Sequence, residues 1–410
     1  MSNRSSLTVY SRIRMDSGRG QMSIRGKAHI VGAFEHPLRE IPGASIAQIH
    51  AEVVVGALRD AGLELADVDG YFCAMDAPGF GAVTLCEYIG LHPSFLDTSE
   101  MGGASYVSHV GHAAAAIAAG KCSVAVISLA GKPRTGGAPP GGSMRGPAAP
   151  EAPFELPFGP TTVSMYAMAA RRHMYEYGTT SRQLAEIKVA AAHHAQYNPN
   201  AFLRKPVTVD EVLDSRMVAD PLHLLDCCVI TDGGGALVVV SSEIARDLPR
   251  RSVKVLGHGE AAKHTDNGRI DLSYTGARFS GPRAFEEAGL SPADIDYASI
   301  YDSFTITALE AIEDLGFCEK GDGGRFVEDG ALQAPYGRLP FNTDGGGLCN
   351  NHPANRGGMT KVIEAVRQLR GEAAPEVQVP DCELALAHGT GGSIGSRMGS
   401  ATVILGGEDA

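Results

Sequence analysis

Apolar residues recur at intervals of three or four over several stretches of the chain, and short continuous apolar runs stand between these stretches. The first pattern is typical of amphipathic helices and the second of buried strands. Together they predict helices over residues 46–61, 104–119 and 357–369, and strands over residues 123–129 and 383–388. Helices that alternate with strands in this way indicate an α/β protein.

One nine-residue segment occurs twice in the chain. Ala61-Gly-Leu-Glu-Leu-Ala-Asp-Val-Asp69 returns as Ala288-Gly-Leu-Ser-Pro-Ala-Asp-Ile-Asp296, with seven of the nine positions equivalent. In both copies a helical pattern ends at the glycine, as a helix C-cap does, and an aspartate-rich turn leads into an apolar strand pattern. We therefore predict a duplicated chain with a first half (residues 24–245) and a second half (residues 250–410).

Two segments fall outside the duplicated pattern. Residues 1–23 are polar and rich in arginine, and we expect them to form a flexible leader. Residues 131–160 hold 7 glycines and 8 prolines, too many for a helix or a central strand. Two helical patterns follow this segment, over residues 162–177 and 181–196. We predict that residues 131–222 are a loop and cap insertion that folds over a functional site.

Composition narrows the class of protein. The 410 residues include 35 Lys and Arg against 47 Asp and Glu, a formal net charge of −12, which disfavours binding to nucleic acid or to an anionic membrane. No window approaches the roughly 20 apolar residues of a membrane span. The eight cysteines form no C-x-x-C pair, and no metal-ligand motif is present. We expect a cytoplasmic protein with reduced thiols and no metal.

Six short motifs follow one another along the chain. They are Gly102-Gly-Ala-Ser-Tyr106, Ala170-Arg-Arg-His-Met-Tyr-Glu-Tyr-Gly178, Asp226-Cys-Cys228, Tyr301-Asp-Ser-Phe-Thr305, Asn351-His-Pro353 and Ala387-His-Gly-Thr-Gly-Gly392. In this order the chain resembles the thiolase superfamily, in the branch of the sterol carrier protein X thiolase domain and the lipid-transfer-protein-type steroid side-chain aldolases. The resemblance implies a thiolase fold, with two duplicated βαβαβαββ-like halves in five α-β-α-β-α layers.

The motifs depart from those of a thiolase at the residues that carry its chemistry. The position of the nucleophilic cysteine falls at Gly103, and His388-Gly-Thr390 replaces the usual Cys-x-Gly segment. Tyr301 stands at the Asn or His position, and only His352-Pro353 is kept. Thiolysis needs a thiolate that holds the acyl group, so the resemblance implies another reaction. We expect retro-aldol cleavage of a β-hydroxyacyl-CoA with a steroid or aromatic side chain, because this reaction needs only proton transfer and enolate stabilisation.

Three residues are the predicted acid and base groups. We expect Tyr301, at the end of a strand, to carry the proton of the β-oxygen, with its pKa lowered or with a neighbouring histidine as relay. We expect His352, at an apparent helix start, to donate to the enolate or protonate its carbon. His388, in a turn from a strand to a glycine loop, is the second acid or base, or it orients the thioester.

Other residues are assigned supporting roles. The predicted oxyanion-site amides are those of Gly103, Thr390 and Gly391, and the predicted supporting side chains are Asp302, Ser303 and Ser105. Cys349, three residues before His352, is the candidate for a displaced nucleophile, although inert burial is the stronger interpretation. We assign Cys227 and Cys228 to a packing turn.

The resemblance also implies partners, and two other functions stay open. Coenzyme A would enter as part of the thioester substrate. Family members are typically dimers or dimers of dimers, and many in this branch work with a small zinc-ribbon/OB-fold protein that binds the CoA moiety. The first alternative is an acyltransferase or thiolase that uses Cys349 or another displaced cysteine. The second is a non-catalytic scaffold that binds acyl-CoA or lipid.

Overall fold

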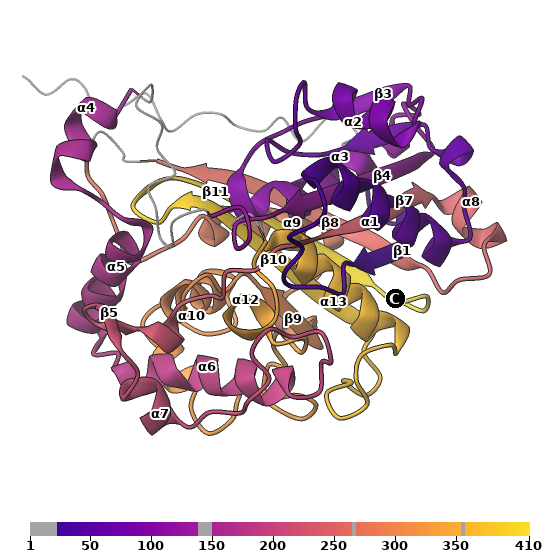
Figure 1. Ribbon diagram of the computed structural model, residues 1–410. Coiled ribbons are helices and arrows are strands. Elements are labelled where there is room, and N and C mark those ends of the chain that lie inside the picture. Colours follow the sequence, from indigo (N-terminus) through magenta and orange to yellow (C-terminus); the bar gives the residue numbers. More distant parts are fainter. Residues whose placement is uncertain (1–22, 138–149, 265–267, 354–356) are drawn as a thin grey trace, which may run out of the picture.

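The computed structural model describes residues 23–137, 150–264, 268–353 and 357–410 (Figure 1). Nearly all of the predicted leader, residues 1–23, lies outside the described residues. Part of the glycine- and proline-rich segment does so as well.

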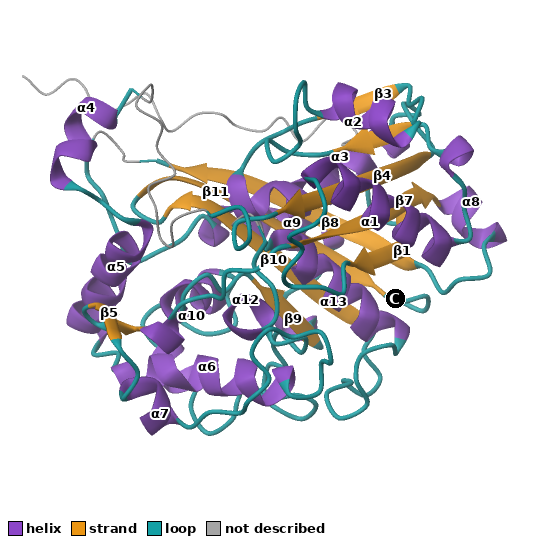
Figure 2. Cartoon of the chain, viewed as in Figure 1, coloured by secondary structure: helices purple, strands orange, loops and turns teal. Residues whose placement is uncertain are grey.

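Within the described residues, nine strands form one mixed sheet in the order β3-β2-β4-β7-β1-β8-β11-β10-β9 (Figure 2). Its strands are β1 (Ala28–Glu35), β2 (Gly70–Phe72), β3 (Phe95–Asp97), β4 (Val124–Gly131), β7 (Gly233–Ser241), β8 (Val253–Lys263), β9 (Tyr297–Ile300), β10 (Leu384–Ser393) and β11 (Ser396–Gly406). The order β2-β4-β7-β1 in the first half returns as β9-β10-β11-β8 in the second half. In each set the first two strands are parallel and the later pairs antiparallel.

The two sets of strands meet where β1 pairs with β8, through His29 opposite Lys254 and Ile30 opposite Val253. The segments with similar sequence form the same elements. Helices α1 (Ile46–Ala61) and α9 (Ala277–Ala288) each end at a glycine with positive φ. A 3-10 turn and a strand then follow in both copies.

Five layers result from the way the helices cover the sheet. Helices α3 (Ser105–Ala118) and α13 (Gly358–Arg370) contact each other and strands of both halves, so they form the middle layer. Helix α1 covers the outer face of the first-half strands, whereas α9 and α10 (Thr305–Asp314) cover that of the second-half strands. This is the predicted thiolase fold. The shorter helices are α2 (Ala82–Ile89), α8 (Ser242–Asp247), α11 (Gly323–Phe326) and α12 (Gly346–Cys349).

The two halves differ beside β2 and β9. In the first half β2 pairs with β3, whereas the corresponding neighbour of β9 is a single bridge between Ala298 and Phe341. There the side chain of Asn342 makes the backbone hydrogen bonds that a neighbouring strand would make. Its Oδ1 accepts from the N–H of Ile300 at 2.9 Å, and its Nδ2 donates to the Ile300 carbonyl at 2.8 Å. The end of β9 is therefore held in place by a side chain.

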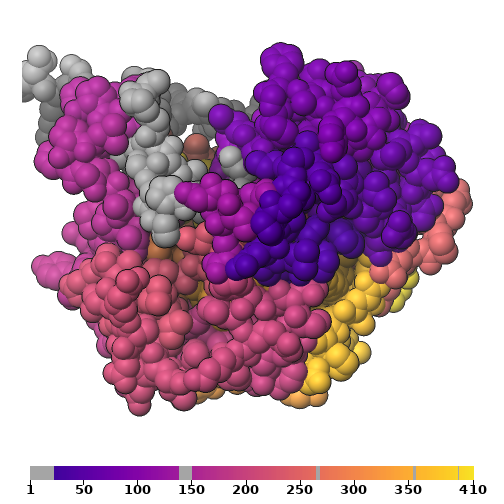
Figure 3. All heavy atoms as spheres, viewed as in Figure 1, coloured from indigo at the N-terminus to yellow at the C-terminus, as the bar shows by residue number. Residues whose placement is uncertain are grey.

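The described part of the insertion is mainly helical. It contains α4 (Ala152–Glu155), α5 (Thr162–Tyr177), α6 (Ser181–Ala195), α7 (Val209–Leu213) and the two-stranded sheet of β5 (Met217–Ala219) and β6 (Leu222–His223). Helices α5 and α6 pack against α10, and α6 also packs against α12 (Figure 1). The space-filling view shows most of these segments on the surface below the first half, whereas the α4 region lies at the upper left (Figure 3).

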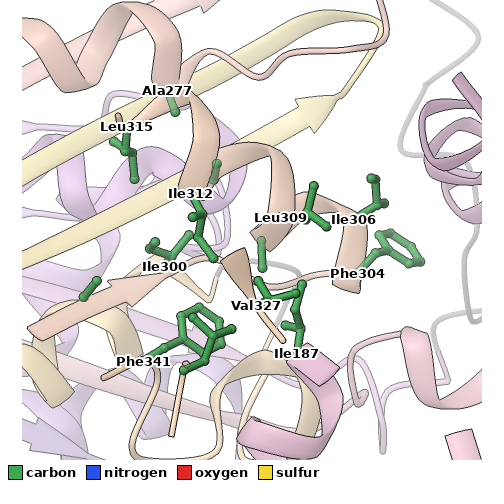
Figure 4. Close-up of a cluster of buried hydrophobic side chains, with 14 of the residues drawn as sticks. Ile187, Ala277, Ile300, Phe304, Ile306, Leu309, Ile312, Leu315, Val327 and Phe341 are labelled. Atoms are coloured by element: carbon green, nitrogen blue, oxygen red, sulfur yellow. The ribbon is translucent and has the colours of Figure 1, made fainter. Parts of the chain in front are cut away.

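A shared hydrophobic core joins the insertion to the second half. Ile187 of α6 lies beside Val327, Leu309 and Phe341, in the same cluster as Ile300 at the end of β9 (Figure 4). All five side chains are buried. The insertion is thus packed onto the elements that carry Tyr301.

Candidate active site

Tyr301 directly follows β9, and hydrogen bonds fix the backbone at Tyr301 and at the residue before it. Its N–H donates to the carbonyl of His388 at 3.0 Å, and the preceding residue, Ile300, is bound by Asn342. The Tyr301 side chain is buried between the two halves, with Gly103 on one side and His352 on the other. The backbone bonds leave the phenol little freedom of position.

Tyr301 and His352 form a close pair. Tyr301 Oη lies 2.7 Å from His352 Nε2, and the other ring nitrogen, Nδ1, lies 3.6 Å from the Sγ of Cys228. The His352 N–H donates to Thr231 Oγ1 at 2.9 Å. The predicted residues Tyr301 and His352, which are 51 positions apart, are thus in direct contact.

Burial keeps the side chains of Tyr301, His352 and Cys228 uncharged. It lowers the pKa of His352 to about 4, although nearby Asp302 acts in the opposite direction. Burial, with smaller contributions from Cys228 and Tyr166, raises the pKa of Tyr301 well above 10. Burial also raises the pKa of the Cys228 thiol. At neutral pH the site therefore holds a phenol, a neutral imidazole and a thiol.

One of the two alternatives expected for Tyr301, and the expected helix start at His352, do not fit the structure. The Tyr301 pKa is raised rather than lowered, because the phenolate would lose its hydration inside the protein, so of the two predicted routes only the relay through a histidine fits. His352 does not stand at a helix start, since Pro353 forms a bridge with Thr231 and α13 begins at Gly358. The pairing with the segment around Thr231 keeps this loop extended.

Gly103 lies in the turn that precedes α3, against the Tyr301 ring. A Cβ atom added at Gly103 would lie 2.4 Å from Cε2 and 2.6 Å from Cζ of Tyr301, and 2.3 Å from the carbonyl oxygen of Thr390. Such distances are far inside van der Waals contact. The ring of Tyr301 therefore fills the space that a side chain at position 103 would need. Nearby, Ser105 Oγ accepts from the Met101 N–H at 2.8 Å and so supports the helix start.

His388 is not in a turn, as we expected, but inside β10, and its side chain points away from Gly103. Its Nδ1 lies 2.8 Å from Thr402 Oγ1, which in turn bonds Ser280 of α9 on the outer face of the sheet. Successive side chains of a strand alternate between faces, and its neighbour Gly389 is the residue that packs against Gly103. Burial lowers the His388 pKa to about 3. His388 contributes its backbone carbonyl, which binds Tyr301.

The glycine-rich segment around Thr390 stays extended because the start of α3 packs directly on it. A Cβ atom at Gly391 would lie 1.9 Å from the Met101 carbonyl oxygen, and one at Gly102 would lie 2.9 Å from Gly391 Cα. Thr390 pairs with Ser400 within the β10–β11 ladder. The backbones of Gly103, Thr390 and Gly391 therefore lie close together beside Tyr301.

Asp302 and Ser303 tie the loop after β9 to its surroundings. Asp302 accepts from the Gly347 N–H at 2.8 Å and forms a buried ion pair with Lys361 of α13 at 2.9 Å. Ser303 lies 3.1 Å from Thr307 and hydrogen-bonds to Tyr166 of α5. The ring of Tyr166 stacks on Phe304 with centroids 4.5 Å apart. The insertion thus supplies a side chain to this loop.

The chain is similar to several known proteins over most of its length. Residues 259–407 match the thiolase C-terminal domain-like family. The acetyl-CoA acetyltransferase of Methanothermobacter thermautotrophicus is 35% identical over 379 residues, which are 90% of this chain and 97% of that protein. The 17-hydroxy-3-oxo-4-pregnene-20-carboxyl-CoA lyase of Mycobacterium tuberculosis is 37% identical over 382 residues, 86% of this chain and 94% of that protein.

A solved structure described as the Ltp2-ChsH2(DUF35) aldolase has a TM-score of 0.84 at 34% identity, and the match covers 94% of this chain and 99% of that one. The chain belongs to the thiolase superfamily. Its predicted place in the branch of sterol carrier protein thiolases and steroid side-chain aldolases is confirmed.

In this thiolase-superfamily chain Cys349 lies in the core and not beside Tyr301. It is 1% exposed at the end of α12, and its thiol accepts from Lys188 Nζ at 3.1 Å. Burial raises its pKa despite the nearby Lys188 cation. A buried thiol that keeps its proton is a poor nucleophile.

Two residues of the site were missed by sequence reasoning. Cys228 belongs to a motif that we assigned to packing, and Tyr166 lies in the insertion. The contact between Cys228 and His352 spans 124 positions, and no local spacing could indicate it. The available signal was the Asp226-Cys-Cys228 motif itself.

Proposed function

We propose that this protein cleaves a β-hydroxyacyl-CoA thioester by a retro-aldol reaction. The β-hydroxyl proton leaves to a base, the Cα–Cβ bond breaks, the β-carbon becomes a carbonyl, and the resulting CoA enolate takes a proton at Cα. The step consumes neither water nor free CoA. The names of the relatives, a carboxyl-CoA lyase and an aldolase, support this reaction class.

The observation that carries the proposal is the steric relation between Gly103 and Tyr301. A thiolase-type reaction needs a nucleophile at position 103, but the ring of Tyr301 lies within 2.4 Å of where its Cβ would be. The same ring presents its hydroxyl to His352 at 2.7 Å. In our proposal the site therefore has a proton-transfer pair, Tyr301 and His352, in place of a nucleophile at position 103.

We assign the proton route to this pair. Tyr301 Oη receives the β-hydroxyl proton while its own proton passes to His352 Nε2, so no free phenolate is formed. A neutral imidazole is needed at the start, and the low pKa of His352 supplies it at neutral pH. Backbone amides at Gly103, Thr390 and Gly391 are our candidates for stabilising the enolate oxygen. Asp302, Ser303 and Ser105 then act by holding the loops.

The domain, partner and location assignments are part of the proposal. We place the boundary of the halves between residues 245 and 250, at the connection from α8 to β8.

We propose a small zinc-ribbon/OB-fold partner for the CoA moiety, supported by the similar structure whose description names two components. We also propose a cytoplasmic location. No described helix has the length and hydropathy to cross a bilayer.

A homodimer or dimer of dimers through the first half is supported by an exposed edge. Strand β3 is the end strand of the sheet, and exposed apolar side chains gather in the same stretch of chain. These side chains are Met75, Phe80, Val83, Tyr88 and Leu96. A strand with one free edge and apolar neighbours is a surface that proteins commonly cover by association. Sedimentation equilibrium would measure the assembly.

The retro-aldol proposal is tested with two CoA thioesters of different acyl class. The first is 17-hydroxy-3-oxo-4-pregnene-20-carboxyl-CoA and the second is 3-hydroxy-3-phenylpropionyl-CoA. Mass spectrometry should detect a ketone or aldehyde together with a shortened acyl-CoA, without added CoA. Each assay is run with and without the candidate partner. Turnover of acetoacetyl-CoA that requires free CoA and stops on thiol alkylation would instead support the acyltransferase alternative. Tight binding of both thioesters without turnover would support a scaffold.

A further inference from the structure

Cys228 occupies a fixed place beside the Tyr301–His352 pair. Its N–H donates to the carbonyl of Ser303 at 2.9 Å, in the loop that follows Tyr301. The next residue, Val229, donates to the Gly347 carbonyl at 2.9 Å, on the segment that leads to His352. The sulfur is therefore held by backbone bonds to both loops of the pair, and it lies 3.6 Å from His352 Nδ1.

A neutral imidazole carries one proton, and the Tyr301 contact decides where it sits. Phenol is the more acidic donor and an imidazole nitrogen the better acceptor, so the 2.7 Å contact is strongest when Tyr301 donates to Nε2. Nδ1 then bears the hydrogen. Inside the protein that N–H needs acceptors, and two lie beside it: the Sγ of Cys228 and the backbone carbonyl of His352 itself, so the side-chain acceptor adds to the preference for this tautomer.

We propose that Cys228 is a positioning residue whose sulfur accepts the Nδ1–H of His352 and so holds the tautomer that can take the Tyr301 proton. This inference rests on the proposed function. It assigns to a thiol the place that a carboxylate has in catalytic triads. Sulfur is a weak, uncharged acceptor, so it orients the ring without raising the basicity of His352 as a carboxylate would.

The tautomer is measured without substrate. Side-chain ¹⁵N NMR of histidine-labelled full-length protein distinguishes protonated from unprotonated ring nitrogens, and His352→Gln identifies the His352 signals. We expect protonated Nδ1 and unprotonated Nε2 in the unmodified protein, and a mixture or reversal in Cys228→Ala. Protonated Nε2 in the unmodified protein would overturn the inference, whatever the reaction proves to be.

Kinetics give the second readout. Cys228→Ala should lower kcat roughly two- to tenfold, the effect of one uncharged hydrogen bond, with little change in KM. Cys228→Ser keeps an acceptor and should restore part of kcat. Cys227→Ala is the matched control, because the Cys227 thiol lies 3.4 Å from the carbonyl of His223 and not at His352. Equal kcat losses in the serine and alanine variants, or in the Cys227 control, would contradict positioning by the sulfur.

The two claims fail separately. If neither CoA thioester is cleaved, the proposed reaction is wrong, but the NMR signals still report whether Cys228 sets the tautomer. If cleavage occurs and Cys228→Ala leaves both the tautomer and kcat unchanged, the reaction stands and the role of Cys228 is wrong. Should the alanine variant not fold, the unmodified protein and Cys228→Ser still decide the question.

Discussion

At the candidate active site the start of α3, from the first half, faces the end of β9, from the second half. The α3 side presents backbone there, because Gly103 meets the Tyr301 ring and packs against Gly389 of β10. The β9 side presents a phenol that contacts His352. The start of α3 therefore defines the shape of the site, and the end of β9 brings its ionisable groups.

At this point of contact the two regions cannot both carry bulky side chains. The ring of Tyr301 and a Cβ atom at position 103 would occupy the same volume. In a densely packed interior such an overlap is relieved only by moving backbone or by removing one side chain. The glycine at position 103 and the tyrosine at position 301 are thus two aspects of one packing solution.

The largest expected effect comes from removing the groups on the β9 side. Tyr301→Phe keeps the ring that fills the space beside Gly103 but deletes the hydroxyl, and His352→Gln deletes the proton acceptor. Each should lower kcat by roughly 10²–10⁴, the usual contribution of a general acid or base, with a small change in KM. Steady-state assays and thermal melts measure both. Full activity in both variants would show that the site assignment is wrong.

A smaller effect is expected on the α3 side. In Gly103→Ala the new methyl overlaps the Tyr301 ring and the Thr390 carbonyl, so we expect a loss of about 1–3 kcal/mol in the free energy of unfolding together with lower kcat. Gly43→Ala is the control, because a Cβ atom there has no neighbour within 4 Å in the part of the chain that the structure describes. Denaturant unfolding that gave equal stabilities for both variants would refute the overlap.

Helix α3 also carries His112, whose surroundings raise its pKa, whereas those of His352 lower the pKa of that residue. Hydrogen bonds to Asp97, at 2.7 Å, and to Glu260, at 3.1 Å, raise the pKa of His112 to about 9. Asp97 belongs to β3 and Glu260 to β8, so a charged imidazole links the two halves. Among the described residues no carboxylate hydrogen-bonds to His352, and burial keeps this imidazole neutral.

The stabilising effect of His112 should depend on pH. Its folded pKa lies above the unfolded value of about 6.5, so its contribution is complete below pH 6.5 and is lost as the pH rises through 9. His112→Gln should cost on the order of 1 kcal/mol of unfolding free energy at pH 6, after allowance for solvent screening, and much less at pH 10. Urea titrations at the two pH values measure this difference. A cost that is the same at both would exclude the charged link.

The smallest effect is expected at Cys349. Cys349→Ala removes a thiol that contacts Lys188 in the core, while the bond from Lys188 to the Leu348 carbonyl at 2.8 Å remains. We expect kcat within about twofold of the unmodified protein, as for a substitution outside the reacting groups. Loss of turnover in a folded variant, or an acyl group found on Cys349 by mass spectrometry, would revive the displaced-nucleophile alternative.

Periodic patterns along the chain were enough to predict the α/β class, the duplication and most of the elements. Helix α1, for example, spans the predicted residues 46–61, because its apolar spacing and the glycine that follows are local signals. Gly103, Tyr301 and His352 could also be singled out, since each stands in a short motif. These properties depend on residues that are near one another in sequence.

Which of those residues meet depends on how the folded chain packs. His388 stands in a motif as marked as that of His352, yet the alternation of β10 turns its side chain toward Thr402 on the outer face. Cys228 contacts His352 although 124 positions separate them. The packing of the halves likewise buries Tyr301 and raises its pKa. Side-chain direction, long-range contact and desolvation arise only when the chain is folded, so sequence determined the elements and the candidate residues, and packing determined their chemistry.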